Sequence, residues 1–502
     1  MVNRKSFSLI VFGALILIIG VLSSGCNKEE FNTSPDFRLA FSTDTVSFDT
    51  IFQGVGSATQ VLKVYNNSDE FITIDRITVI DSCNTYDPFR INVDGFPGPS
   101  VSEIEIGPED SAFIFVEVTI DTAQICTALE VGVLEFAING NLQYVTLFAY
   151  GLDAIFYTPT VFPDNGLPPY TIIDPTPGAT ITWTPEKPIV VYGYAVVDAG
   201  QKLVVEPGTQ IYFHQGSGLW VFEDAYIECG DENGEAVIFQ GDRLEEFFEE
   251  EPGQWDRIWI NGASQANVNT FENTIIKNNF IGIQVEPSPF DPAVSNALVQ
   301  NGIELKNVAI RNNSIAGIFS RNYRIQAQNL LISAGGQYNL AVTGAGQYRF
   351  DHCTFANNWS ASTRQTPAVF LTNLYQVDSE TIATGDIINS RFRNCIIHGN
   401  GLNEFGFDFE TSSNSIDLSI DHTMIRMLEE DFLALDQSYF SEEIFVGFDP
   451  GFINFSGGDF RLREDAFARF KGTSQGALPN FDIVGTPYNN PRPLGCFEYL
   501  PE

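Results

Sequence analysis

The chain has 502 residues and carries 64 acidic against 26 basic side chains, a formal net charge of −38. Nucleic-acid binding needs clustered Lys and Arg to neutralise phosphates, so this composition excludes nucleic-acid partners. The length leaves room for two or three domains. Seven cysteines are present, but no Cys-x-x-Cys or His–Cys grouping predicts a zinc site.

The first 25 residues have the pattern of a secretion signal. Arg4 and Lys5 give a positive start, residues 7–22 are apolar, and small residues precede Cys26. A membrane span needs about 20 apolar residues, which makes a plain transmembrane anchor the less favoured alternative.

The segment LSSGC resembles a bacterial lipobox, although Ser23 stands where that motif prefers Leu. The resemblance implies that residues 1–25 are a lipoprotein signal peptide and that Cys26 is acylated. Lys28-Glu29-Glu30 resembles the export signal of Bacteroidota-type surface lipoproteins. We therefore expect residues 26–35 to be a tether at the outer membrane facing the cell exterior, with an ordinary polar tether as the alternative.

Residues 36–154 alternate apolar and polar side chains between closely spaced turns, which predicts an antiparallel β-sandwich. An F-D-T strand, a V-Y-N-N-S turn and a G-P-E-D-S turn follow in the order seen in Hydin-like immunoglobulin-type domains, which this region resembles. Cys83 and Cys126 lie in it and could pair outside the cytoplasm. Residues 155–187 contain seven prolines and are expected to form a stiff linker.

A nine-residue phrase then recurs, first as FENTIIKNN from Phe271 and last as the worn copy IDHTMIRML from Ile420. The shortest spacings between copies are 22 and 23 residues, a period that predicts a solenoid of short strands. The sixth position is always large and apolar. The third position suits a left-handed corner and a column of stacked polar side chains; it is occupied by Asn273, Asn307, Asn329, His352, Asn394 and His422.

The phrase resembles the repeat of the right-handed parallel β-helix of the pectate-lyase type. The resemblance implies that residues 188–465 form such a helix, that the third-position side chains are a structural ladder, and that residues 466–502 cap its end. The fold class expected for the chain is therefore all-β. Cys353 and Cys395 share the fourth position and are expected to be buried free thiols in one column.

The best binding candidate in the sequence is WDRIWI. If the isoleucines of this strand face the core, Trp255, Arg257 and Trp259 form an outward stripe suited to sugar rings, joined by Trp220 and Tyr212 from upstream coils. The alternative is an arginine stacked beneath a neighbouring loop.

Evidence for catalysis or metal binding in the sequence is weaker. The acidic loop Asp242–Gln254 could bind Ca²⁺, but it lacks D-x-D spacing and also fits a solvated insertion. The acids of two other insertions, around Asp378–Asp386 and Asp408–Glu410, form no recognisable motif. No cofactor and no catalytic residue are predicted.

These patterns together predict a lipid-anchored surface protein that binds glycans or cell-surface polymers without turning them over. The alternative is a surface polysaccharide lyase or glycoside hydrolase, and a passive spacer is a third possibility.

Overall fold

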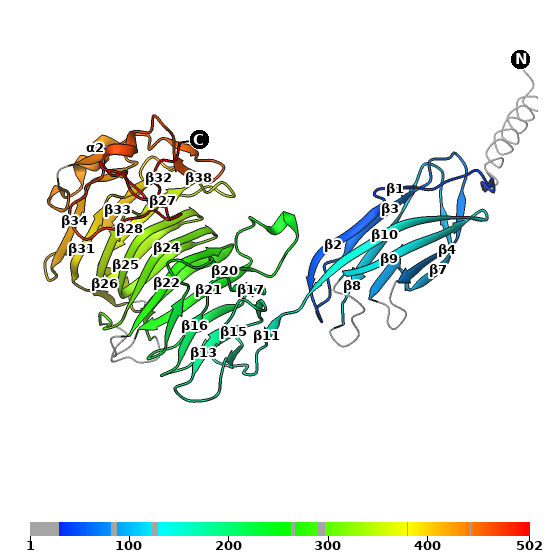
Figure 1. Ribbon diagram of the computed structural model, residues 1–502, viewed down its shortest axis with the longest axis horizontal. Coiled ribbons are helices and arrows are strands. Elements are labelled where there is room, and N and C mark those ends of the chain that lie inside the picture. The colour runs from blue at the N-terminus through cyan, green and yellow to red at the C-terminus, as the bar shows by residue number, and fades with distance from the viewer. Residues whose placement is uncertain are drawn as a thin grey trace, which may run out of the picture. The chain divides into compact units, whose positions relative to one another are not determined.

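The computed structural model describes residues 30–81, 88–121, 129–262, 267–288, 297–378, 380–441 and 443–501. The chain divides into two compact units, with the boundary between Asp153 and Ala154. Both are built almost entirely of strands (Figure 1). This confirms the predicted fold class.

The first unit is a sandwich of two five-stranded sheets. All strand pairs within them are antiparallel except one, in which Thr146 of β10 lies beside Thr45 of β2. One sheet has the order β1 (Ala40–Phe41), β3 (Gln60–Tyr65), β8 (Ser111–Val118), β5 (Phe89–Val93), β6 (Phe96–Gly98). The other has the order β2 (Thr45–Phe52), β10 (Asn141–Leu152), β9 (Leu129–Ile138), β4 (Ile72–Asp81), β7 (Ser100–Ile106).

Strict alternation explains why these segments form a sandwich. In β8 the side chains of Ile114, Val116 and Val118 are fully buried, whereas Phe113 and Phe115 between them are exposed. Successive side chains of a strand point to opposite faces of a sheet, so each strand contributes one apolar face to the space between the sheets. Burying each such aliphatic side chain is worth about 1.5–3 kcal/mol.

The described part of the expected tether belongs to this unit. The carbonyl of Glu30 accepts a hydrogen bond of 2.9 Å from the amide of Phe71, and Phe31 forms a bridge with the same residue. Residues 1–29 lie outside the described residues, and so do Cys83 and Cys126. No helix among the described residues is long and apolar enough to cross a membrane.

The second unit is a parallel β-helix whose strands stack along three faces, which we call faces A, B and C. Figure 1 shows the successive strands as parallel rungs from β13 to β34. Four long strands turn corners and contribute to more than one face: β22 (Val268–Lys277), β24 (Gly302–Asn313), β25 (Ala316–Gly335) and β26 (Tyr338–Asp351).

The remaining strands of each face follow in chain order. Face A contains β11 (Ile155–Tyr157), β14 (Ile189–Val191), β17 (Gln210–Phe213), β20 (Val237–Gly241), β27 (Thr354–Asn357), β32 (Ile396–Gly399), β35 (Thr423–Ile425) and β36 (Ile444–Val446). Face B contains β12 (Tyr170–Ile172), β15 (Tyr194–Val197), β18 (Gly218–Val221), β21 (Trp255–Gly262), β23 (Asn279–Pro287), β28 (Val369–Thr372) and β33 (Phe405–Asp408). Face C contains β13 (Thr180–Trp183), β16 (Lys202–Val205), β19 (Tyr226–Cys229), β31 (Ile387–Arg393) and β34 (Ile416–Asp421).

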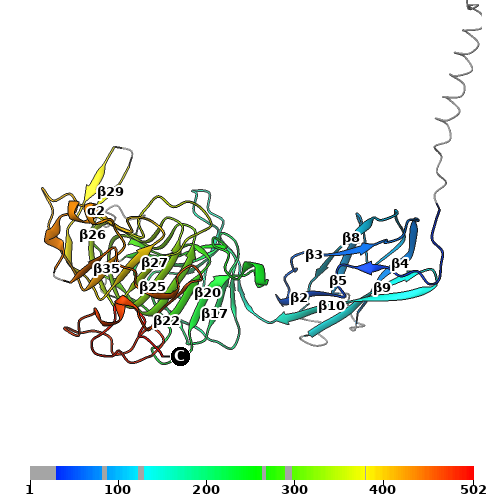
Figure 2. The same cartoon turned by 90° about the horizontal axis from the view of Figure 1, so that it is seen from above.

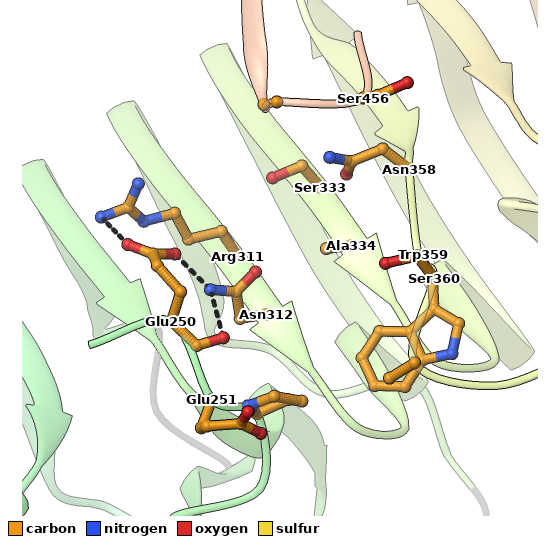
Figure 3. A pocket seen from close by; sticks show the side chains of 14 residues that line it. Glu250, Glu251, Arg311, Asn312, Ser333, Ala334, Asn358, Trp359, Ser360 and Ser456 are labelled. Atoms are coloured by element: carbon orange, nitrogen blue, oxygen red, sulfur yellow. Dashed lines mark hydrogen bonds and ion pairs between the residues drawn. The ribbon is translucent and has the colours of Figure 1, made fainter. Parts of the chain in front are cut away.

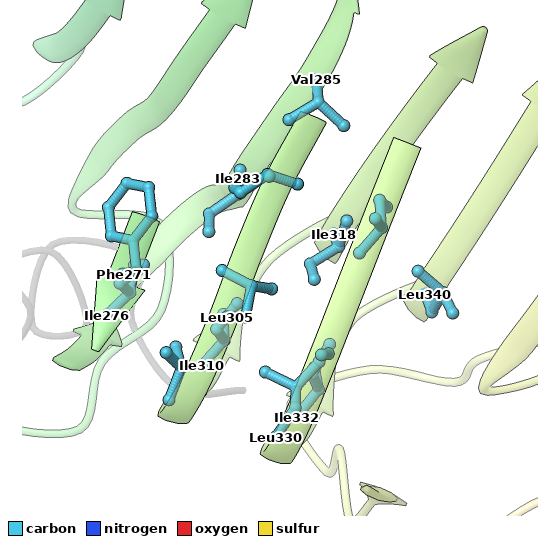
Figure 4. Close-up of a cluster of buried hydrophobic side chains, with 14 of the residues drawn as sticks. Phe271, Ile276, Ile283, Val285, Leu305, Ile310, Ile318, Leu330, Ile332 and Leu340 are labelled. Atoms are coloured by element: carbon cyan, nitrogen blue, oxygen red, sulfur yellow. The ribbon is translucent and has the colours of Figure 1, made fainter. Parts of the chain in front are cut away.

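The sixth position of the phrase fills the interior of the coils, as predicted. Its six side chains lie on face A, point inward and are fully buried: Ile276, Ile310, Ile332, Phe355, Ile397 and Ile425. They pack against inward residues of the other faces, such as Ile283 and Leu305 (Figure 4). Cys353 and Cys395 occupy this interior on consecutive rungs as free buried thiols, as predicted.

The prediction of a linker over residues 155–187 is wrong. Strands β11, β12 and β13 lie in this segment and pair in parallel with β14, β15 and β16, so the prolines occupy the connections of a first coil. Trp183 is buried in this coil and donates a hydrogen bond of 3.1 Å to the Tyr157 hydroxyl. Proline cannot donate to a ladder but is tolerated between short strands, which explains how both features coexist.

The prediction that residues 466–502 cover the end of the solenoid is also wrong. The short helix α2 (Glu429–Ala434) and the turn after it cover the last interior, where Phe432 and Tyr439 join the core. The C-terminal segment, which we define as residues 448–498, includes β37 (Phe452–Asn454) and β38 (Asp459–Leu462) and packs sideways on face A (Figure 1). A second hairpin, β29 (Leu374–Gln376) with β30 (Ile382–Thr384), projects from the stacked strands (Figure 2).

Candidate functional site

The predicted outward stripe on β21 is only partly present. Trp255 is fully buried, stacks on Phe213 at 4.3 Å between ring centroids, and donates a 2.8 Å hydrogen bond to the carbonyl of Lys277. Asp256 and Arg257 both lie outside the core, so the inward residues Trp255 and Ile258 are three positions apart instead of two. The pairing with β23 shifts register at the same point, and such an irregularity reverses the alternation that the prediction assumed.

Trp220 and Trp259 do lie together on the outer side of face B. Their rings stack at 4.6 Å, but Trp220 is covered by Leu167 and Tyr170 and is only 4% exposed. Trp259 donates to the Glu286 carboxylate at 2.8 Å, and Arg321 pairs with the same carboxylate. These contacts use the polar atoms that a ligand would need.

Arg257 and Tyr212 are also placed away from an open stripe. Arg257 pairs with Asp256 and donates to Gln284. Tyr212 belongs to face A, not face B, and is nearly buried. The structure therefore does not bring the five predicted residues together.

The third position of the phrase forms the corner between faces C and A, which we call the ladder corner. All six residues have the left-handed backbone that was predicted, with φ between 43° and 55°. Asn329 donates to Asn307 at 2.8 Å, and Asn394 bonds the Nε2 of His352 at 2.9 Å, as expected for stacked polar side chains.

The ladder is not in the interior of the coils, however. The C-terminal segment covers its central part: Tyr488 stacks on His352 at 4.3 Å and donates to Asn329, while the backbone of Thr473 bonds both amide atoms of Asn394. Burial lowers the pKa of His352 to about 3, so the ring is neutral. His422, at the end of the column, pairs with Asp421 and is partly exposed.

The seventh position of the phrase forms a column on the outer side of face A. Register pairs Lys277 with Arg311, Arg311 with Ser333, Ser333 with Ala356, and Ala356 with His398. Arg426 continues the column, because Ile425 pairs with Ile397. Four of these six residues are basic in a strongly acidic chain. We call this column the seventh-position stripe.

The adjacent fifth position is different. Leu331, Ile396 and Met424 lie beneath the apolar side chains of the C-terminal segment. Face A therefore carries a covered apolar stripe and, two residues along each strand, a polar stripe that borders open hollows.

One of these hollows has a volume of about 530 Å³ and lies beside the corner between faces A and B. This corner, which we call the open corner, has left-handed backbone at Asn278, Asn312 and Ala334. Figure 3 shows Ser333 and Ala334 on the strand between Arg311 and Trp359, with Ser456 on a loop of the C-terminal segment.

The acidic loop forms one side of this hollow. Glu250 pairs with Arg311 at 3.2 Å and accepts a hydrogen bond from Asn312 (Figure 3). Lys277 and Asn278 donate to the backbone carbonyl of Glu249 and so fix the loop to the corner. The loop is a folded wall, and its acids do not gather around a point: no group of three or more His, Cys, Asp or Glu suited to a metal occurs in the part of the chain that the structure describes.

Trp359 forms the opposite side. Its ring passes close to Gly336, where an added Cβ would lie 3.2 Å from the indole, and its Nε1 donates to Ser362. Asn400 donates to its carbonyl, which fixes the segment after β27. The indole is partly exposed at the hollow.

Two further hollows continue from the first. One, of about 340 Å³, shares Glu251 and Pro252 with it and is lined by His214, Asp242 and Phe248. The other, of about 460 Å³, shares Ser456 and is lined by His398 and Arg426. The three hollows lie in a row along face A, and we call this row the groove; from β17 to β35 it covers about 34 Å at about 4.8 Å per rung.

The first of these two hollows contains a His–Asp pair. The Nδ1 of His214 lies 2.8 Å from Asp242, and the imidazole stacks on Tyr192 at 4.6 Å. Burial raises the pKa of Asp242, and the hydrogen bond to His214 partly opposes this. When Asp242 accepts from Nδ1, the Nε2 of His214 is the nitrogen able to accept a proton.

The acids of the other insertions bind their own loops. Glu410 accepts hydrogen bonds from Ser412, Ser413 and Asn414, which lower the pKa of its carboxyl to about 2. Asp378 accepts from two amides of its own turn, and Asp386 accepts from the amide of Ser415. Each of these carboxylates therefore accepts hydrogen bonds that stabilise the loops.

Sequence reasoning missed the seventh-position stripe and Trp359. The stripe was readable, because positions five and seven of each phrase alternate with the buried sixth position. Trp359 follows one copy directly but has no counterpart in the others, so periodicity could not find it.

Comparisons with known proteins do not assign a function to the chain. No protein-family model matches the chain, and no curated protein matches it. Among solved structures, a family 123 glycoside hydrolase from Clostridium perfringens is 10% identical with a TM-score of 0.18, and the match covers 23% of this chain and 25% of that chain. The chain thus spans about a quarter of that protein.

Two other solved structures are similar at the same low level. PapD-like domain 7 of human CEP192 is 9% identical with a TM-score of 0.18, over 24% of this chain and 93% of that chain. The catalytic unit of a GH87 α-1,3-glucanase from Streptomyces thermodiastaticus strain HF3-3 is 9% identical with a TM-score of 0.25, over 72% and 73%. TM-scores this low carry no argument about activity.

Proposed function

We propose that the protein binds an extended carbohydrate chain along the groove on face A. The observation that carries this proposal is the lining of the central hollow, where one partly exposed indole faces a row of hydrogen-bonding side chains across several rungs. A groove that is open along the strand-stacking direction accommodates a polymer better than a compact small molecule.

The residue types suit a sugar. The face of the Trp359 indole can pack on the apolar face of a sugar ring, as aromatic side chains do with flat partners. Arg311, Asn312, Ser333 and Asn358 offer donors and acceptors for hydroxyl groups.

Binding without turnover is supported by the state of the Glu250 carboxylate, which lies across the central hollow from Trp359. Glycoside hydrolysis uses two carboxyl groups flanking the bond to be broken. Glu250 is instead held by Arg311 and Asn312.

The proposal is tested with an array of polysaccharides read for both binding and product. We expect saturable binding of at least one polysaccharide and a loss of about tenfold or more in affinity for Trp359→Ala, since buried aromatic anchors dominate binding energy. Tyr144→Ala is the control, because Tyr144 is an exposed aromatic residue of the sandwich and lies outside the groove. Unchanged affinity in Trp359→Ala would contradict the proposal.

Polysaccharide cleavage is a second candidate, favoured by the His214–Asp242 pair at one end of the groove. A neutral imidazole oriented by a carboxylate can accept a proton from water or from a sugar carbon. The same array then yields new reducing ends or products that absorb in the near ultraviolet, and His214→Gln abolishes them. Absence of any product with the intact protein rejects this candidate.

We further propose that the chain is anchored by lipid on Cys26 at the outer membrane, with Lys28, Glu29 and Glu30 directing it outward. The support is the resemblance of the N-terminal sequence to lipoprotein signals. Cys26→Ala should release the protein from membranes, and external protease should trim it on intact cells. Trimming only in broken cells would reject the outward orientation.

A further inference from the structure

The end of the groove near β35 differs in charge from its centre. In the central hollow Arg311 is neutralised by Glu250 at 3.2 Å. In the hollow at the end, no described residue forms a hydrogen bond or ion pair with the guanidinium of Arg426. A partly exposed guanidinium without a protein partner among the described residues leaves its N–H groups available to a ligand.

His398 lies beside Arg426 on the seventh-position stripe. Its ring packs edge-on against Phe452 and Phe455, and its Nδ1 is buried without a hydrogen-bond partner among the described residues. Burial and then the charge of Arg426 lower the pKa of His398 to about 4. The hollow is thus lined by two adjacent side chains, a charged guanidinium open to solvent and a neutral imidazole whose buried Nδ1 has no partner among the described residues.

We propose that this hollow binds an oxyanion carried by the carbohydrate chain, a carboxylate or a sulfate ester, between Arg426 and His398. Guanidinium groups bind carboxylate and sulfate oxygens through paired N–H donors. The imidazole supplies a donor or accepts a proton when the anion arrives. The inference rests on the proposed function for its polymer, but the hollow itself is defined by its own residues.

The other charges around the hollow are consistent with a single specific anion. Arg463 lies 3.9 Å from Asp449 and 3.3 Å from Asp465, so its charge is already balanced. Asp449 lines the hollow but is largely exposed. Exposed carboxylates at the mouth repel anions weakly after screening by salt, and they disfavour polymers whose charge is not placed at Arg426.

The experiment uses the intact protein with three small probes: D-glucuronate, D-glucose 6-sulfate and D-glucose. The chain has four histidines, so a histidine-selective NMR spectrum is simple, and His398→Gln assigns the relevant signal. We expect at least one of the two anionic sugars to raise the pKa of His398 by about one pH unit or more, because a bound opposite charge favours the imidazolium. Glucose should leave it unchanged.

Arg426→Gln should weaken binding of the effective anion about tenfold or more, and Arg426→Lys should restore part of it. Arg461→Gln is the control, because it removes the same charge from β38, which belongs to the C-terminal segment and does not line the hollow. The response to glucuronate against glucose 6-sulfate distinguishes the two anionic groups. Equal effects of Arg426→Gln and Arg461→Gln would overturn the site, as would responses to all three sugars or to none.

Failure of the anion site can be distinguished from failure of the proposed function. If a polysaccharide binds through Trp359 while the sugar anions leave His398 unaffected, the groove stands and the anion site is rejected. If an anion raises the pKa of His398 in a way that depends on Arg426, while Trp359→Ala leaves the affinity for every polysaccharide unchanged, the anion site stands and the proposed groove function is rejected.

Discussion

The ladder corner and the open corner are built from the same nine-residue phrase and differ in what covers them. Both turn through left-handed residues, Asn394 at one and Asn312 at the other, for example. The C-terminal segment closes the first, and its side chains bond that segment. At the open corner the same kind of asparagine borders a hollow and holds an exposed loop. The same backbone conformation is therefore covered by protein at one corner and borders an open hollow at the other.

We expect the largest difference between the two corners in the pH dependence of stability. His352 has a pKa of about 3 in the folded protein against about 6.5 unfolded, so between these values the unfolded chain binds more protons. Stability is therefore retained above pH 6.5 and lost as pH falls toward 3, by up to about 5 kcal/mol from this residue. The measurement is the free energy of unfolding in denaturant as a function of pH.

His352→Asn is the control, because asparagine occupies this position in other copies of the phrase. It should remove that part of the pH dependence. His398, beside the open corner, has a pKa of about 4 and should contribute a smaller loss of about 3 kcal/mol. A larger effect from His398 than from His352 would contradict the assignment of the covered side.

Replacing one asparagine by alanine at each corner compares their contributions to stability directly. Asn394→Ala removes three hydrogen bonds among His352 and the backbone of Thr473 in a buried site and should cost about 3 kcal/mol. Asn312→Ala removes bonds to Glu250 and Asn278 in a partly exposed site and should cost about 1 kcal/mol. Both replace asparagine by alanine at positive φ, so the backbone contribution is matched. Equal costs, measured by chemical unfolding, would show that burial does not distinguish the corners.

The smallest effect is expected at Ala334, the one alanine with positive φ at the open corner. A Cβ in left-handed backbone costs about 1–2 kcal/mol, whereas glycine loses about 0.5–1 kcal/mol of chain entropy on folding. Ala334→Gly should therefore stabilise the protein by about 0.5 kcal/mol. Gly282→Ala, at a position without room for a Cβ, should destabilise it and serves as the opposing control. A loss of stability in Ala334→Gly would mean that its methyl group is needed for packing.

Much of the fold could be predicted because its pattern is local. The buried sixth position and the left-handed third position follow from alternation and from the tolerance of Asn for positive φ. The linker prediction failed because short strands between prolines show no repeat of their own, yet they pair with the next coil. The prediction for Trp255 was wrong because one irregularity in β21 turns this side chain to the core face of the strand.

The candidate site was less predictable than the fold. Trp220 and Trp259 do stack, but the loop containing Leu167, which precedes Trp220 by 53 residues, covers Trp220. Arg311 and Arg426 were visible as basic residues at a fixed position of the phrase. They differ in that Arg311 has an ion-pair partner, Glu250, which comes from an insertion outside the repeat.

The amino-acid sequence by itself determined the acidic composition and, within the repeated phrase, the strand period and the residues that face the core, because the phrase alternates over a few positions. Only the tertiary structure decided which corner of the solenoid is covered and which remains open. That choice depends on contacts such as Tyr488 with Asn329, which join residues 159 positions apart. Long-range packing of this kind has no periodic signal, so the repeated phrase defines both corners but does not say which of them faces a ligand.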